Sequence, residues 1–205
     1  SNALTISSGA KLTIGQSQAI SVNGTSNFSG NTCLELNSGA INTASFIDNG
    51  TINGIYTAKV NRYITAANWS NAGDGWHLLS SPVTDQPLLG NPEWNPTGTG
   101  NGFDFFSFDE TVTTPYEYWI NLKYNPGLFS TFGEGKGYLV AYQVSGTKSF
   151  TGKLNTQDIV LTGLSNTTGS SYPGWHLVGN PFASAINWGT GSWTKTNIDA
   201  IAQVW

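Results

Sequence analysis

The sequence predicts an all-β protein, in which a short β-solenoid-like region is followed by an antiparallel β-sandwich. Apolar and polar residues alternate over short runs, which is typical of half-buried strands. Glycine and asparagine bound these runs, and the chain contains 25 glycines. Aromatic residues make up 13% of the chain and supply apolar surface for a sheet core.

The composition argues against several classes of function. Only 10% of the residues are charged and the basic residues form no cluster, so we expect no nucleic-acid binding. No apolar run approaches the roughly 18 residues of a membrane-spanning helix, so no membrane span is expected. Cys33 is the single cysteine, which excludes an intrachain disulfide and a cysteine-based metal site. We expect Cys33 to be a small, half-buried side chain.

Residues 4–68 are predicted to form the β-solenoid-like region. Leu4 and Ile6, and then Leu12 and Ile14, alternate with small polar residues. A phrase of the type L-x-[IL]-x-S-G-A occurs twice, once with an extra serine. Such repeats suit about three stacked coils, each of which buries its apolar side chains against the next. The pattern leaves an ordinary antiparallel meander open as the alternative.

Residues 69–205 are predicted to form the β-sandwich, because the aromatic residues concentrate there. The boundary is placed between residues 62 and 76, in a polar, turn-rich stretch. A short helix fits residues 183–186 or 196–201. The strands expected in this region span residues 76–79, 103–108, 116–122, 137–142, 147–153, 157–161 and 175–178.

An eight-residue phrase occurs twice in this second region. "GWHLLSSP" begins at Gly75, and "GWHLVGNP" begins at Gly174, 99 residues later. An active site is usually built once, whereas a structural unit can be built twice. The duplication therefore favours a structural role for the phrase.

Each phrase carries a tryptophan and ends on a proline. We expect Trp76 and Trp175 to be core anchors, so that replacing either by alanine costs about 3–5 kcal/mol. Pro82 and Pro181 are expected to end their strands, because proline cannot donate to a strand ladder.

His77 and His176 are the only histidines in the chain. A catalytic role would need a nucleophile or carboxylate partner at both copies, and a shared metal site is a minor alternative. We expect each imidazole to hydrogen-bond a backbone group beside its strand. The glycine-rich loop around Lys136 precedes a strand and not a helix, so we interpret it as a turn and not a phosphate site.

Four stretches of the chain together carry a resemblance: "FIDNGTINGIYTAKVNRYI", "GWHLLSSPV", "GEGKGYLVAY" and "GWHLVGNPFASAINW". They resemble modules of large secreted and surface proteins of Bacteroidetes-type bacteria, which often end in a type IX secretion sorting domain. In such modules G-W-[HN]-L-[IVL]-G-N-P leads to A-I-[DN]-W, matched here at residues 185–188, and later to a G-x-G-[FY]-x-V strand. The first copy departs, with "SSP" in place of "GNP", but it keeps the third landmark at Gly135, Gly137, Tyr138 and Val140. The resemblance implies an extracellular or cell-surface location and brings no catalytic residues with it.

The expected function is that of a non-catalytic structural or adhesive module within a larger surface or secreted bacterial protein. Duplication, low charge and the solenoid-like texture favour it. Other domains of the same chain are the expected partners, together with glycans or surface proteins. The protein is expected to be no enzyme and to need no cofactor.

A carbohydrate-binding module is the alternative, because exposed tryptophan and tyrosine rings stack on sugars. Trp94 lies in a turn-rich stretch, and Tyr118 adjoins Trp119. Two or more coplanar rings facing solvent in a groove would favour this function over core packing.

Acidic residues offer two further alternatives. A glycoside hydrolase needs two carboxylates about 5–9.5 Å apart, and Asp104, Asp109 and Glu110 lie near one another in the sequence. Asp109 and Glu110 could also hold Ca²⁺ together with loop carbonyls. We treat the hydrolase as the remote alternative and calcium as the one candidate ion.

The second copy of the phrase is expected to be truncated. The first copy reaches its third landmark at Val140, whereas the second is followed by only a short, apolar stretch that ends at Trp205. Either Trp205 docks onto the first copy, or further strands complete the second one. We favour further strands, which would leave an edge or apolar patch open here.

Overall fold

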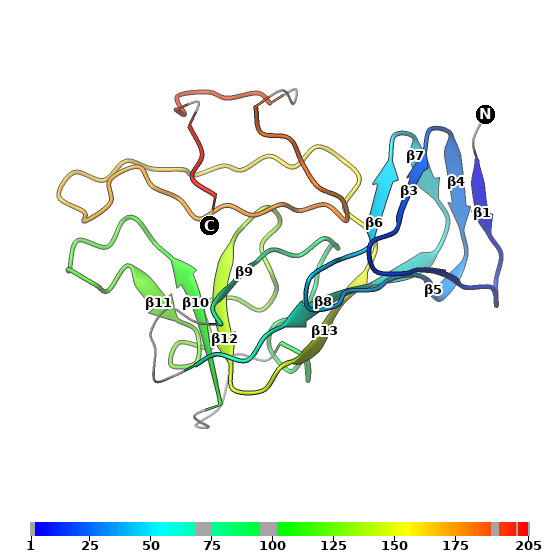
Figure 1. Ribbon diagram of the computed structural model, residues 1–205. Coiled ribbons are helices and arrows are strands. Elements are labelled where there is room, and N and C mark those ends of the chain that lie inside the picture. Colours follow the sequence, from blue (N-terminus) through cyan, green and yellow to red (C-terminus); the bar gives the residue numbers. More distant parts are fainter. Residues whose placement is uncertain (1–2, 69–74, 95–101, 190–192, 200, 205) are drawn as a thin grey trace.

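The computed structural model is all-β, as the sequence predicts (Figure 1). It describes residues 3–68, 75–94, 102–189, 193–199 and 201–204. This part of the chain forms four sheets, none of which closes into a barrel. It contains no helix, so the helix expected at residues 183–186 is not formed. No helix among the described residues is long and apolar enough to cross a membrane.

Parallel strands build the N-terminal part, which lies at one end of the molecule in Figure 1. Each strand pairs with the strand one circuit later, at an offset of 22 residues between Leu4 and Ser26 and 26 residues between Thr25 and Thr51. Alternation directs one side of each strand inward, and Ile6, Ile14 and Val22 are buried. The parallel ladders are β1 (Leu4–Ile6) with β4 (Thr25–Phe28) and β7 (Thr51–Asn53), β2 (Leu12–Ile14) with β5 (Gly30–Leu36) and β8 (Tyr56–Ile64), and β3 (Ala19–Val22) with β6 (Ser45–Asp48).

The corners of successive circuits stack on one another. Asn49 Nδ2 donates to Asn23 Oδ1 over 2.8 Å, so equivalent corner asparagines share a hydrogen bond. Gly54 has a φ of 108°, and a Cβ there would lie 2.0 Å from the carbonyl oxygen of Phe28. The corner therefore needs glycine both for its conformation and for the close approach of the circuit below.

Cys33 is fully buried and not half-buried as the sequence suggested. The register between β5 and β8 shifts between Gly30 and Leu34, which breaks the strict alternation of faces. Both Cys33 and Leu34 then lie inside, and burial raises the pKa of the thiol.

An antiparallel sheet occupies the other end of the molecule (Figure 1). The strands expected at residues 76–79, 103–108 and 137–142 are present within one residue of their expected ends. The segments at 157–161 and 175–178 form no strand, and the one at 116–122 is reduced to three residues. The sheet order is β11 (Trp119–Asn121), β10 (Phe103–Phe108), β12 (Tyr138–Tyr142) and β9 (His77–Leu79).

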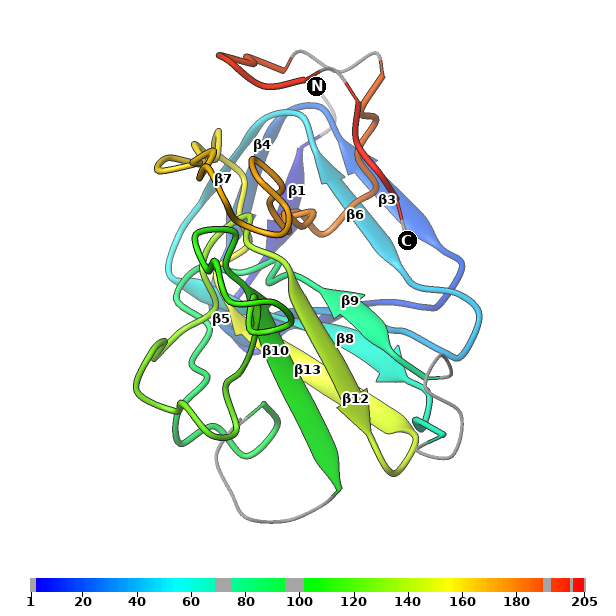
Figure 2. The ribbon, with the colours of Figure 1, turned by 90° about the vertical axis from the view of Figure 1, so that its left-hand side faces the viewer.

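The two parts share a sheet and a core. Strand β13 (Gly146–Gly152) pairs antiparallel with β8, so that it extends the sheet of β2, β5 and β8 (Figure 2). One buried cluster includes Leu34 from the parallel part and Phe105 from the antiparallel part. The division of the chain at residue 68 stays a prediction, and residues 69–74 lie outside the described part.

The C-terminal segment has no strand from residue 155 to the last described residue and crosses over the antiparallel sheet (Figure 1). It returns to the parallel part, where the amide of Phe46 donates to the carbonyl of Ala183 over 2.9 Å. Ile201 and Val204 are exposed. Trp205, for which we considered docking, lies outside the described residues.

Candidate functional site

The two histidines make the same contact in the two copies of the repeated phrase. His77 Nε2 lies 3.1 Å from the nitrogen and 3.3 Å from the oxygen of the Thr65 backbone. His176 Nε2 lies 3.1 Å and 2.9 Å from the corresponding atoms of Ser165. An unprotonated Nε2 accepts from the amide and a protonated one donates to the carbonyl, so either form holds that residue. Each imidazole thus binds the backbone, as the sequence predicts.

The turn that precedes each tryptophan is also repeated. Gly75 has a φ of 79° and Gly174 a φ of 77°. A Cβ on Gly75 would lie 2.4 Å from the carbonyl oxygen of Ala66, and one on Gly174 would lie 3.1 Å from Nδ2 of Asn166. Ala66 and Asn166 each follow the residue that the histidine holds, so each copy closes the same kind of loop.

Both copies pair with one continuous stretch of chain. The first copy pairs as β9 with β12, where Leu79 lies opposite Tyr138. The second copy pairs with the residues just before β12: Gly137 N donates to Leu177 O over 3.0 Å, and Gly179 N donates to Gly135 O over 2.9 Å. The glycine-rich segment before β12 forms a turn at residues 134–135, as the sequence predicts, and its backbone also pairs with the second copy.

The two copies meet at equivalent positions. Ser80 and Gly179 each hold the sixth place of their phrase. A Cβ on Gly179 would lie 2.3 Å from Cβ of Ser80, a separation that real side chains do not reach. One of the two copies must therefore carry glycine there, which explains why "SSP" in one copy faces "GNP" in the other.

Asn155 ties the ends of both copies together. It is 5% exposed, and its side-chain Nδ2 donates to Ser81 O over 3.2 Å and to Pro181 O over 2.9 Å. Its backbone amide donates to Pro82 O over 3.0 Å. The two prolines end their segments and offer carbonyls that one asparagine satisfies.

The residue before each proline makes a similar tight turn, although it is a serine in one copy and an asparagine in the other. Ser81 Oγ accepts from the amide of Val83 over 3.3 Å, and Asn180 Oδ1 accepts from the amide of Phe182 over 2.9 Å. Serine and asparagine both favour such turns through a bond to the amide two residues later.

Glu110 holds the loop that leads into the second copy. Its carboxylate is 2% exposed and accepts from the hydroxyl of Ser165, from N and Oγ1 of Thr167 (3.2 and 2.9 Å), and from the amide of Gly174 (3.2 Å). The Ser165 hydroxyl, followed by the amides of Thr167 and Gly174, lowers the pKa of Glu110 to about 2. Ser165 is also the residue that His176 holds, so the loop is closed from both sides.

Tyr118 and Trp119 belong to a partly exposed aromatic strip on the outer face of β10 and β11. Phe108 contacts Trp119 at 5.1 Å between ring centroids with an interplanar angle of 74°, and Tyr118 contacts Tyr172 at 4.8 Å and 79°. These rings pack edge to face and form no coplanar platform. The strip consists of Phe106, Phe108, Tyr118, Trp119 and Tyr172.

Trp94 is fully buried, so the expectation of an exposed ring is wrong. It stacks on Phe150 at 4.4 Å, meets Phe132 edge-on at 5.5 Å, and donates from Nε1 to Ser149 O over 2.7 Å. The residue does lie in a turn, where Asn91 Oδ1 accepts from the Trp94 amide over 3.2 Å. A turn fixes the backbone at the surface but leaves the side chain free to point inward.

A family model described as a domain of unknown function, DUF8693, matches residues 1–205. The chain belongs to this family. No curated protein and no solved structure matches the chain.

The acidic candidates of this DUF8693 domain are engaged in local contacts. Asp104 Oδ1 accepts from Asn121 Nδ2 over 2.8 Å, and Asp109 Oδ1 accepts from the amide and hydroxyl of Thr111 at 2.9 and 2.7 Å. Within the described ranges no group of three or more His, Cys, Asp or Glu side chains is placed to hold a metal. Calcium binding by Asp109 and Glu110 stays a prediction, and the oxygens of Glu110 already accept four hydrogen bonds.

Trp175 of the DUF8693 domain is 54% exposed, so its expected role as a core anchor is wrong. In the second copy His176 and Leu177 are half-buried, whereas Trp175 is exposed. Trp76 is half-buried and contacts Phe106 at 5.8 Å between centroids.

We expect Trp175→Ala to change the free energy of unfolding by less than about 1 kcal/mol, as exposed substitutions do. Trp76→Ala should cost more, because it removes a ring contact within the sheet. Urea denaturation followed by circular dichroism compares the two variants. A loss for Trp175→Ala that equals or exceeds the loss for Trp76→Ala would contradict this assignment.

The Glu110 contacts predict how stability depends on pH. The folded-state pKa of about 2 lies below the ordinary value of 4.5, so the unfolded chain binds the proton more readily. The stabilisation is complete above about pH 4.5 and is lost as the pH falls toward 2. Thermal unfolding across this range should show a steeper loss for the wild type than for Glu110→Gln. Glu117→Gln, at an exposed position, is the control that should follow the wild type.

Several important residues of this DUF8693 domain gave no sequence signal. Asn155 lies between the strands expected at residues 147–153 and 157–161, and Arg62 lies within an ordinary strand pattern. Glu110 is predicted only as a candidate catalytic carboxylate or calcium ligand, and not as a structural residue. The "SSP" and "GNP" difference was visible, but only the contact of Ser80 with Gly179 explains it.

Proposed function

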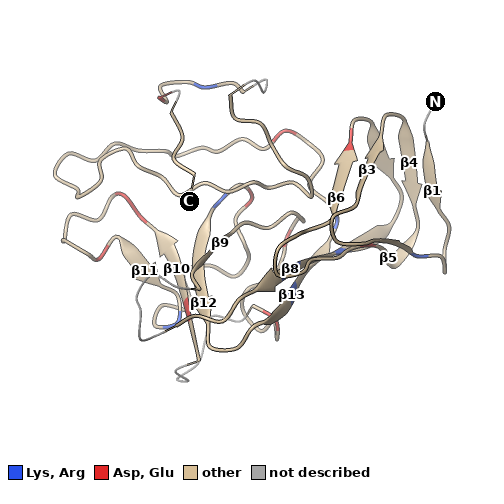
Figure 3. Ribbon diagram, in the orientation of Figure 1, with Lys and Arg blue, Asp and Glu red and all other residues tan. Residues whose placement is uncertain are grey.

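We propose that this domain is a non-catalytic structural or adhesive module of a larger secreted or surface bacterial protein. Its partners would be other domains of the same chain, with glycans or surface proteins as external partners. The resemblance to modules of type IX secretion substrates supports an extracellular or cell-surface location. Charged positions are few and of mixed sign along the ribbon, which does not suit nucleic-acid binding (Figure 3).

The observation that carries this proposal is the use of the repeated phrase. Its two histidines, which are the obvious candidates for chemistry, both bind backbone atoms of the loop that precedes them. Glu110, the buried carboxylate, holds the second of these loops. These histidine and carboxylate groups, which an enzyme would direct at a substrate, here hold loops of the protein in place.

The finer architecture belongs to the same proposal. We infer that the parallel ladders form a short β-solenoid that acts as a stem, and that the antiparallel part forms a sandwich-like head. Three stacked circuits with corner asparagines support the first. The sheet of β9 to β12, packed through Phe105 and Tyr138 against a shared core, supports the second.

A carbohydrate-binding module remains the second candidate, because Tyr118 and Trp119 are partly exposed. The edge-to-face packing of the aromatic strip argues against a flat sugar platform. A glycoside hydrolase is the remote candidate, since Asp104, Asp109 and Glu110 all accept hydrogen bonds from the protein itself.

A glycan array with the purified domain, combined with a hydrolysis screen on the same glycans, tests the proposal. The structural function predicts no hydrolysis and no binding that depends on the aromatic strip. Glycan binding abolished by Trp119→Ala, but kept in Tyr116→Ala at a nearby exposed position, would replace it with the carbohydrate-binding function. Hydrolysis abolished by Asp104→Asn or Asp109→Asn in a folded protein would replace it with the hydrolase.

A further inference from the structure

Arg62 is an arginine on the core-facing side of a strand. In β8 it alternates with Val60 and Ile64, which are 0% and 1% exposed. Its Nη1 donates to the carbonyl of the neighbouring Asn61 over 2.9 Å, which uses one of five guanidinium donors. Across the described ranges, the ion pairs join Glu35 to lysines, and none includes Arg62.

The surroundings of Arg62 add positive charge and remove solvent. Lys148 of β13 lies directly opposite Arg62 in the antiparallel register, so the cross-strand neighbour has the same sign. Burial lowers the pKa of the Arg62 guanidinium, but the group stays charged at neutral pH. A charge placed inward without a partner is costly, and an anion beside it would offset that cost.

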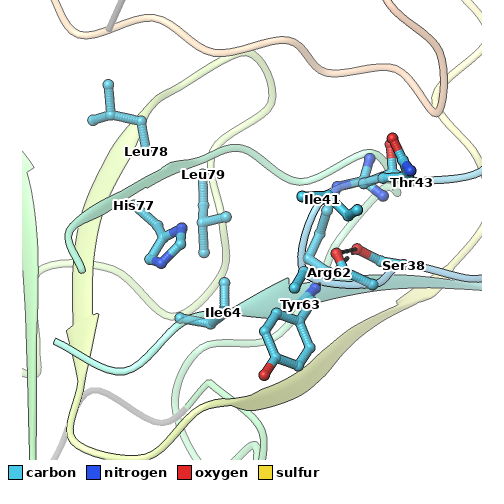
Figure 4. Close-up of a pocket in the computed structure, with 12 residues that line it drawn as sticks. Ser38, Ile41, Thr43, Arg62, Tyr63, Ile64, His77, Leu78 and Leu79 are labelled. Atoms are coloured by element: carbon cyan, nitrogen blue, oxygen red, sulfur yellow. Dashed lines mark hydrogen bonds between the residues drawn. The ribbon is translucent and has the colours of Figure 1, made fainter. Parts of the chain in front are cut away.

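A groove of about 540 Å³ opens at Arg62. Its walls are the loop at residues 38–43, the end of β8 and the strand β9, and in Figure 4 the Arg62 side chain extends toward the loop that carries Thr43. Asn42 and Thr43 of this loop are exposed. Among the described contacts, their side chains make no hydrogen bond within the protein. The groove thus offers hydroxyl and amide groups beside a guanidinium of which one donor is used within the protein.

We propose that this groove binds a carboxylate that is flanked by hydroxyl groups, as in the uronate units of an acidic glycan, with Arg62 as the anchor. A planar guanidinium binds a carboxylate through two parallel hydrogen bonds. Asn42 and Thr43 hydrogen-bond the hydroxyls. This site is separate from the aromatic strip, and it adds a binding function that the structural role does not require.

Three small probes separate the parts of this proposal. Glucuronate carries the carboxylate and the hydroxyls, glucose lacks the carboxylate, and acetate lacks the hydroxyls. Each is titrated into the ¹⁵N-labelled domain at low ionic strength, and the amide shifts are followed by NMR. We expect glucuronate to bind in the millimolar range, with the largest shifts in residues 38–43, 62–64 and 77–79, and to bind more tightly than either other probe.

Variants test the anchor directly. Arg62→Gln should weaken glucuronate binding by roughly tenfold or more, and Arg62→Lys should weaken it by less, because the charge stays but the fork is lost. Lys153→Gln removes one exposed positive charge elsewhere and should bind as the wild type does. Thr43→Val, at an exposed position, should weaken glucuronate but leave acetate unchanged.

Specific outcomes would overturn the proposal. If the wild type binds glucuronate no more tightly than glucose, the carboxylate does not contribute to binding. If it binds acetate as tightly as glucuronate, the sugar hydroxyls do not contribute. Shifts confined to residues outside the groove would place the binding site elsewhere. Equal affinity in the wild type and in Arg62→Gln would also overturn it, and if Arg62→Gln fails to fold, Arg62→Lys and Thr43→Val decide.

Discussion

Trp94→Ala is expected to lower the free energy of unfolding by about 3–5 kcal/mol, the range for removing a large aromatic side chain from a core. The ring is fully buried and contacts both Phe132 and Phe150. The variant also leaves the carbonyl of Ser149 without the indole donor. Urea denaturation monitored by far-ultraviolet circular dichroism measures the loss.

Trp94→Phe separates the two contributions. It keeps an aromatic ring against Phe150 but lacks the N–H that reaches Ser149, so its loss should be clearly smaller than that of alanine. A loss below about 1 kcal/mol for Trp94→Ala would mean that the ring is not in the core. It would also support the sequence-based expectation that Trp94 is an exposed, sugar-stacking residue.

Asn155→Ala is expected to cost about 2–4 kcal/mol, because two buried carbonyls lose their donor at once. These are the carbonyls of Ser81 and Pro181, one from each copy of the repeated phrase. The loss should appear as a lower free energy of unfolding, measured as for Trp94.

Two further variants serve as a comparison and a control for Asn155→Ala. Asn155→Asp replaces the donor by a second acceptor that faces the same carbonyls, so it should be at least as damaging as alanine. Asn53→Ala, at an exposed position whose side chain makes no hydrogen bond among the described residues, should change stability by about 0.5 kcal/mol or less. Equal effects of Asn155→Ala and Asn53→Ala would contradict the role of Asn155 in joining the two copies.

The sequence correctly predicted those strands in which an apolar pattern coincides with a neighbouring strand to pair with. Residues 103–108 formed β10 as expected, because aromatic alternation and flanking turns act locally. The apolar run at residues 157–161 formed no strand, since a strand also needs a pairing partner and this segment is part of no described sheet. Local pattern therefore predicted strand tendency, and tertiary pairing decided where strands form.

The candidate site was predictable only in part. Two similar phrases pointed to a repeated structural unit, and the histidine contacts with the backbone were expected from that. The burial of Trp94 and the exposure of Trp175 were not, because a single sequence does not show which side of a turn or edge segment faces the core. Contacts such as Asn155 with Ser81 join residues 74 positions apart, and no local pattern encodes them.

The central claim is that the two copies of the phrase are one structural device used twice, and that they meet at Ser80 and Gly179. A double-mutant cycle in the free energy of unfolding tests it most directly. Gly179→Ala places a Cβ 2.3 Å from that of Ser80 and should cost about 1–3 kcal/mol.

In the Ser80→Gly background the nearest remaining atom is the Lys136 carbonyl oxygen at 3.4 Å, so Gly179→Ala should then cost less than about 0.5 kcal/mol. This rescue is the result that the account predicts. An equal cost of Gly179→Ala in both backgrounds would show that the two copies do not meet there, and would contradict the account.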